Sequence, residues 1–105
     1  MAHPKLDVTV ELQQQWRNNQ LTLKPVFTGA EGQFNYLIRV TKQGASGSVT
    51  TQQAGQLSLQ GMPLTASSVT LNLSPEDHCK VVLELLQDGQ SLLTRTFECV
   101  VPDNQ

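Results

Sequence analysis

Hydrophobic and polar residues alternate along most of the chain. Such a period of two is typical of strands with one buried and one solvated face. It predicts strands at residues 6–12, 21–27, 34–41, 56–60, 63–73, 79–87 and 92–101. The third is the clearest, with one face made of Phe34, Tyr36, Ile38 and Val40 and the other of Asn35, Leu37, Arg39 and Thr41. Pro25 lacks a backbone donor, which predicts an edge or a bulge in the second strand.

Turn residues separate these runs. Residues 28–32 read as a turn, and residues 88–91 (Asp-Gly-Gln-Ser) are a strong hairpin signal. Residues 43–56 carry one large apolar side chain, Val49, which predicts a short edge strand or hairpin with high mobility. Residues 74–77 (Ser-Pro-Glu-Asp) resemble a helix start, but the apolar run that follows is short and β-branched. We expect a single turn at a sheet corner there.

The pattern predicts an all-β fold, an immunoglobulin-like (fibronectin-type) antiparallel β-sandwich of about seven strands. A chain of 105 residues has room for one core, so we expect one domain over residues 1–105. Residues 1–5 are expected to be disordered or foreign to the natural protein, and residues 102–105 to be a frayed tail.

Charge is distributed unevenly along the chain, although the net charge is only −2. Residues 12–75 contain one acid, Glu31, and four basic residues, which are Arg17, Lys24, Arg39 and Lys42. From residue 76 onwards there are six acidic residues and two basic ones, Lys80 and Arg95. This split suggests a weakly basic surface for an acidic partner, while chance clustering of solubilising charges remains the simpler interpretation. The chain is not basic enough for nucleic-acid binding.

No apolar run is long enough to span a membrane, and no leader is visible, so we expect a signal peptide to be absent or removed.

The two cysteines lie near the ends of the last hairpin, and two registers are open. In the first, Leu86 faces Leu92, Lys80 faces Glu98, Val81 faces Phe97 and Cys79 faces Cys99. In the second, Leu86 faces Leu93, Glu84 faces Arg95, Val82 faces Phe97 and the cysteines are out of line. The first register in an oxidising compartment permits a disulfide. Two buried thiols or a redox pair are the alternatives.

The sequence argues against an enzyme. Asp77, His78 and Cys79 offer an acid, a base and a nucleophile, but neighbours on a strand point to opposite faces. A metal site from His78, Cys79 and Cys99 lacks a fourth ligand and a spacing signature. The chain has no nucleophile elbow and no phosphate-binding glycine loop, and no cofactor is expected.

Several short motifs resemble the CsgC/CsgH family of curli amyloid assembly inhibitors. They are Leu-Asn-Leu-Ser-Pro-Glu-Asp at 71–77, Lys-Val-Val at 80–82, Asp-Gly-Gln-Ser-Leu at 88–92, Leu-Ile-Arg-Val at 37–40 and the Gly-Ser-rich segment 44–48. The resemblance covers residues 6–97, and its force lies in the order of the motifs. The enterobacterial branch carries Cys-X-Cys on the third strand, where this chain has Tyr36-Leu37-Ile38. The chain therefore looks closer to the CsgH-type branch, and a structural disulfide is the more natural use of its cysteines.

The resemblance implies a monomeric periplasmic chaperone-like protein that keeps the acidic, disordered curli subunit from nucleating fibrils. Contact would be transient and electrostatic, with no membrane insertion. The residues matching the family's basic strand are Arg39 and Lys42, with Lys24 and Arg17 as weaker candidates. Arg39 alternates outward, whereas Lys42 has inward parity and must lie past the buried part of its strand. The alternatives are a secreted immunoglobulin-like binding or assembly module without anti-amyloid activity, and a periplasmic thiol-disulfide protein.

Overall fold

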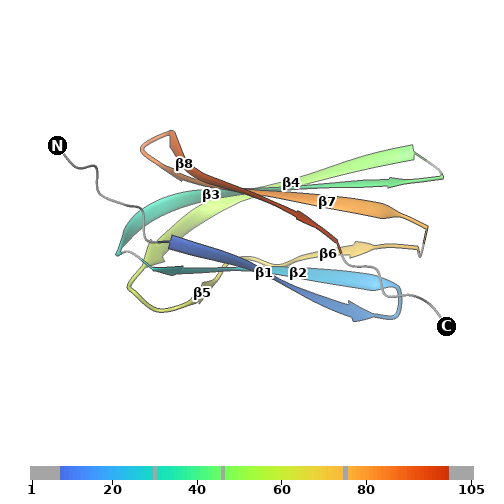
Figure 1. Cartoon of the computed structure of the whole chain (residues 1–105), viewed down its shortest axis with the longest axis horizontal. Coiled ribbons are helices and arrows are strands. Elements are labelled where there is room, and N and C mark those ends of the chain that lie inside the picture. Colours follow the sequence, from blue (N-terminus) through green and yellow to red (C-terminus); the bar gives the residue numbers. More distant parts are fainter. Residues whose placement is uncertain (1–7, 30, 46, 75, 100–105) are drawn as a thin grey trace.

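The computed structural model describes residues 8–29, 31–45, 47–74 and 76–99, and within them the chain forms eight strands and no helix. Two antiparallel sheets pack as layers (Figure 1). Sheet 1 contains β1 (Val8–Arg17), β2 (Gln20–Gly29), β5 (Leu64–Thr65) and β6 (Val69–Asn72). Sheet 2 has the order β4 (Gly47–Leu59), β3 (Gly32–Gly44), β7 (His78–Gln87) and β8 (Gln90–Glu98).

The core lies between the sheets and is mainly aliphatic. Its largest fully buried side chains are Phe27, Leu21, Leu23, Ile38, Leu83 and Leu85. These residues come from β2, β3 and β7, whose buried positions alternate with more exposed ones as in a two-layer sandwich, except that residues 25–27 of β2 are all buried. The all-β antiparallel fold expected from the sequence is confirmed, and its strand order is compatible with an immunoglobulin-like topology.

β1 and β2 form a hairpin around Asn18 and Asn19, whose φ angles are 52° and 65°. Asparagine tolerates this left-handed region, and two such residues make the tight turn that suits twisted strands. The expectation of an edge or bulge at Pro25 is wrong, because β2 is paired on both sides and runs in unbroken register with β1. Pro25 is tolerated because the ladder on its other side is interrupted there, between β5 and β6.

The β3–β4 hairpin runs the length of sheet 2 (Figure 1). The expected short edge strand within residues 43–56 and the brief strand at 56–60 are one strand of 13 residues, β4, paired with β3 from Gly32↔Leu59 to Gly44↔Gly47. Backbone pairing with β3 sustains β4 although few of its side chains are buried. The length was underestimated, while the edge position is correct.

The segment 63–73 holds two short strands, β5 and β6, both paired with β2. Val69 and Leu73 are buried and Leu71 is half-buried, so these alternate residues lie on the side of the segment that faces the core. The corner that follows is a turn in which the backbone N–H of Asp77 donates to Ser74 O at 2.9 Å and Asp77 Oδ2 accepts from Ser74 N–H at 2.9 Å. The expectations for residues 1–7 and 100–105, which include the start of the first expected strand and the end of the last, lie outside the described residues.

The β7–β8 hairpin follows the first of the two open registers over most of its length. Lys80 pairs with Glu98 and Val81 with Phe97, as that register requires. Near the turn, however, Leu86 pairs with Ser91 instead of Leu92 or Leu93, because a β-bulge places one extra residue, Leu92, on β8.

Cys79 and Cys99 form a disulfide, with their Cα atoms 5.1 Å apart. Cys99 N–H also donates to Cys79 O at 2.9 Å, so the covalent link lies at the end of the ladder, one position beyond the pair of Lys80 and Glu98.

Candidate protein-binding surface

The outer face of sheet 2 is the side turned away from the core, and it presents Arg39. This residue is exposed and pairs with Gln52 on β4 and Val82 on β7. Arg39 Nε donates to Gln52 Oε1 at 3.2 Å, which directs the guanidinium over β4. Since a guanidinium has five N–H donors, the group retains donors for a ligand.

Apolar side chains accompany Arg39 on this face. Leu37 on β3 and Val82 and Leu86 on β7 have outward parity and are half-buried. The alternation along β3 places Leu37 on the outer face. On β7, Val81-Val82 and Leu85-Leu86 are consecutive apolar residues, so the first of each two lies on the inner face and the second on the outer face. The face therefore combines the Arg39 cation with half-buried aliphatic side chains.

The structure also brings Lys80 and Glu84 beside Arg39. Because Arg39 pairs with Val82, these two residues are its diagonal neighbours on β7. Glu98 faces Lys80 from β8. The division of the sequence into a basic and an acidic part missed Lys80, since β3 and β7 pair across those parts. An antiparallel pairing of the third strand with residues 79–87 would have revealed it.

Lys42 lies away from this face. It has inward parity and is half-buried, and its Nζ donates to Asn72 O at 3.2 Å, at the end of β6 in the opposite sheet. Lys42 also lines a hollow of about 560 Å³ together with Glu76 and Asp77. Lys42 thus shares a hollow with two acidic residues at the end of the sandwich, past the buried part of β3.

Lys24 and Arg17 lie on sheet 1. Both have the outward parity of their strands, because Leu21 and Leu23 on β2 and Val8 on β1 are the buried positions. Lys24 pairs with Gln13, and Arg17 pairs with Gln20 beside the turn. The four basic residues named from the sequence therefore occupy three separate places and do not form one patch.

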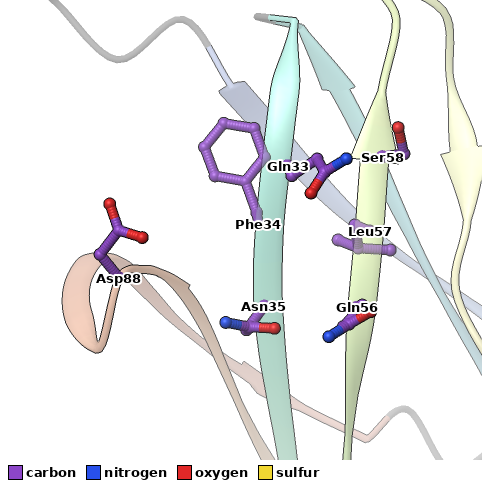
Figure 2. A pocket seen from close by; sticks show the side chains of 7 residues that line it. All are labelled: Gln33, Phe34, Asn35, Gln56, Leu57, Ser58 and Asp88. Atoms are coloured by element: carbon purple, nitrogen blue, oxygen red, sulfur yellow. The ribbon is translucent and has the colours of Figure 1, made fainter.

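A hollow of about 400 Å³ lies at one end of sheet 2. Figure 2 shows Asp88, at the β7–β8 turn, across from β3, with Asn35 and Gln56 side by side on β3 and β4. Gln33 and Ser58 add further hydrogen-bonding groups, and Phe34 and Leu57 complete the lining. This set of amides and one carboxylate can hydrogen-bond a peptide segment.

The described residues do not assemble the candidate catalytic set. Cys79 is bonded to Cys99 and has no thiol, His78 is exposed, and Asp77 is engaged with the Ser74 backbone. No group of three or more His, Cys, Asp or Glu side chains suitable for a metal occurs in the described part of the chain. Nor does a helix long and apolar enough to cross a membrane occur there.

Fold and surface together define a small antiparallel β-sandwich with an exposed, charged and partly apolar sheet face. The family model for thin aggregative fimbriae synthesis protein, Tafi-CsgC, matches residues 7–97. The chain belongs to this family, and the resemblance to the CsgC/CsgH proteins is confirmed.

Individual relatives are similar over part or most of the chain. Curli assembly protein CsgC from Escherichia coli, in strain K12 and in O1:K1 / APEC, is 40% identical over 52 residues, which are 49% of this chain and 46% of the relative. The match thus spans about half the length of these curated relatives.

Two solved structures share the fold. E. coli curli protein CsgC has a TM-score of 0.66 at 24% identity, covering 87% of this chain and 96% of that one. R. palustris CsgH has a TM-score of 0.63 at 24% identity, covering 88% of each chain. The two similarities are nearly equal, so assignment to the CsgH-type branch stays a prediction from the absent Cys-X-Cys motif.

Proposed function

We propose that this protein is a periplasmic chaperone-like inhibitor of curli amyloid assembly. It would hold an acidic, disordered curli subunit through brief electrostatic contacts centred on Arg39. Membership of the family carries the proposal, because its curated relatives are named curli assembly proteins. The match with those relatives spans about half of their length, so the activity and the partner are inferred for this chain.

The charge of the β3–β4 hairpin supports this partner. Residues 32–59 contain no acid, and of their two cations Arg39 is exposed on the outer face, while Lys42 is half-buried at the end of the sandwich. Glu84 and Glu98 lie on β7 and β8, which are further from the β4 margin of sheet 2 than Arg39 is. An acidic segment approaching from the β4 side therefore meets positive charge first.

The physical mechanism follows from how amyloid grows. A nucleus adds strands to exposed edges, and stacked segments protect one another from water. A protein that captures single subunits keeps these segments apart, and it needs neither a cofactor nor a deep pocket. Exposed charges are screened over about 8–10 Å at physiological salt, so the contact is weak and reversible.

A fibril-formation time course tests the proposal. A substoichiometric amount of this protein should lengthen the lag of the curli subunit at low salt, and the delay should shrink as salt rises. Arg39→Glu should abolish the delay. Arg95→Glu makes the same charge change on β8, where Arg95 pairs with Leu83, and should leave the delay intact. No delay with the unmodified protein would instead favour a secreted immunoglobulin-like module without anti-amyloid activity.

We also propose that the protein acts in the periplasm as a monomer, after removal of a signal peptide. The Cys79–Cys99 disulfide suits that oxidising compartment. Cell fractionation with detection of free thiols tests the periplasmic location and the oxidised state of the two cysteines. The oxidised protein should be recovered in the periplasmic fraction, and recovery of the reduced protein in the cytosol would contradict it.

A further inference from the structure

The free edge of sheet 2 at β4 differs from the other sheet margins. Within the described residues, β4 pairs with β3 on one side and with no strand on the other. Its 13 residues contain no charge and no proline, and its register with β3 has no bulge. Proteins commonly block edges with charged residues, proline, bulges or short strands, and β4 has none of these.

Each of the other margins carries at least one such feature. β8 contains the bulge at Leu92 and the charged residues Arg95 and Glu98. β1 carries Glu11 and Arg17, and its Gln14 Nε2 donates to Glu98 O at 3.2 Å, across to sheet 2. β5 and β6 have two and four residues. A strand can therefore be added most readily at β4.

The hydrogen-bond alternation shows which β4 groups are free. Cys99 N–H donates to Cys79 O, so the backbone of Cys79 faces β8, and His78 and Lys80 face β3. The β3 residues that pair with His78 and Lys80 consequently point their backbone N–H and C=O groups to β7. The β3 residues that alternate with them point these groups to β4. Continued across β4, the alternation turns the backbone N–H and C=O of Thr50, Gln52, Ala54 and Gln56 to the free edge.

We infer that β4 is the docking edge for the client, which adds to sheet 2 as an extended antiparallel or parallel strand. This inference rests on the proposed function and specifies where and how the same client binds. Backbone hydrogen bonds to the four edge-facing residues would supply the affinity. Specificity would come from Arg39, which Gln52 Oε1 holds over β4.

The charge beside the β4 edge indicates which partner binds there. A side chain opposite Gln52 on the added strand would share the outer face with the Arg39 guanidinium, where a carboxylate is favoured. A second copy of this chain would bring the same uncharged strand and the same two cations of residues 32–59. An acidic extended segment of the curli subunit is therefore the better match.

Hydrogen exchange of the backbone amides gives a direct test with the intact protein and a monomeric curli subunit. In the free protein, the amides of Thr51 and Gln53 should already be slow, since they bond to β3. The amides of Thr50, Gln52, Ala54 and Gln56 should slow by about tenfold or more when the subunit is added. Unchanged exchange at these four amides during inhibition would overturn the inference.

A proline variant gives the functional test. Ala54→Pro removes an edge-facing N–H without removing a bond to β3, and Ala54→Ser keeps the N–H as the matched control. Ala54→Pro should raise the concentration that doubles the fibrillation lag by about tenfold, and Ala54→Ser should change it less than about twofold. Circular dichroism checks that both variants fold. If Ala54→Pro is unfolded, the exchange experiment on the unmodified protein decides.

The outcomes separate the two proposals. If the unmodified protein does not delay fibrils, the proposed function fails. If it delays them and Ala54→Pro delays them equally, the docking edge is wrong while the function stands. A concentration-dependent doubling of mass without client, with protection of the same four amides, identifies a second copy as the occupant and also overturns the inference.

Discussion

Tyr36 and Gly55 face each other across the β3–β4 ladder, and the Tyr36 ring fills the space that a β-carbon at position 55 would need. Such a carbon would lie 2.6 Å from Tyr36 Cε1 and 2.9 Å from Tyr36 Oη. Tyr36 is buried and its ring centroid is 6.1 Å from that of Phe27 on the other sheet. The glycine thus allows an aromatic contact between the layers beneath an edge strand.

Gly55→Ala should lower the free energy of unfolding by about 1–3 kcal/mol, because the added carbon displaces a buried ring. Urea denaturation measures this change. Ser58→Ala, an exposed position on the same strand, should stay within about 0.5 kcal/mol of the unmodified protein. The loss should shrink when Tyr36 is Leu, and an undiminished loss in that background would contradict the steric explanation.

Reduction of the Cys79–Cys99 disulfide should lower the free energy of unfolding by about 3 kcal/mol, because the link closes a loop with a sequence separation of 20. Thermal unfolding with and without reductant measures the effect. The double variant Cys79→Ala, Cys99→Ala should be insensitive to reductant and, where folded, should still delay fibrils. A delay that required an exchangeable disulfide would favour the thiol-disulfide alternative.

Substitutions at Lys42 and Arg39 should affect stability and inhibition of fibril formation separately. Lys42→Met removes the bond from Nζ to Asn72 O between the sheets and should cost about 1 kcal/mol of stability while retaining the fibrillation delay. Arg39→Gln, on the exposed outer face, should change stability by less than about 0.5 kcal/mol while abolishing the delay. Paired denaturation and fibrillation measurements check both, and the reverse pattern would contradict the assignment.

The β7–β8 turn depends on Asp88 and Gly89, whose φ angles are 53° and 77°. Gly89→Ala should cost about 1–2 kcal/mol, because a β-carbon disfavours the left-handed region. Asp88→Asn should be nearly neutral, since asparagine tolerates that region as well as aspartate does. Denaturation midpoints test the pair, and equal effects of the two substitutions would show that backbone conformation is not the cause.

Local alternation predicted the two faces of β3 and the final hairpin correctly, because both depend on neighbours in sequence. It underestimated β4, whose pairing with β3 substitutes for buried side chains. Neither register considered for β7 and β8 included the bulge at Leu92, since side-chain pairing alone does not reveal an inserted residue. The pairing of Lys80 with Glu98 was nevertheless correct beyond the bulge.

The candidate site was harder to predict than the fold. Parity placed Arg39 outward and Lys42 inward from the sequence, and the structure agrees with both. Grouping charges by sequence position failed, because the β3–β7 pairing sets Lys80 and Glu84 beside Arg39 while Lys24 and Arg17 lie on the other sheet. Contacts between segments far apart in the chain cannot be obtained from composition.

The disulfide and the Asp88–Gly89 turn close β7 and β8 into a ring of chain that runs from Cys79 to Cys99. Covalent bonds therefore join β7 and β8 at both ends of this margin of sheet 2, so β8 cannot separate from β7 starting at either end. The opposite margin, β4, follows β3 directly in the chain at the Gly44–Gly47 end, and beyond that end it is held by backbone hydrogen bonds to β3 and by the buried side chains of Leu57 and Leu59. No disulfide opposes separation of β4 from β3 at its far end, so the edge strand without blocking residues is also the one without a covalent link at both ends.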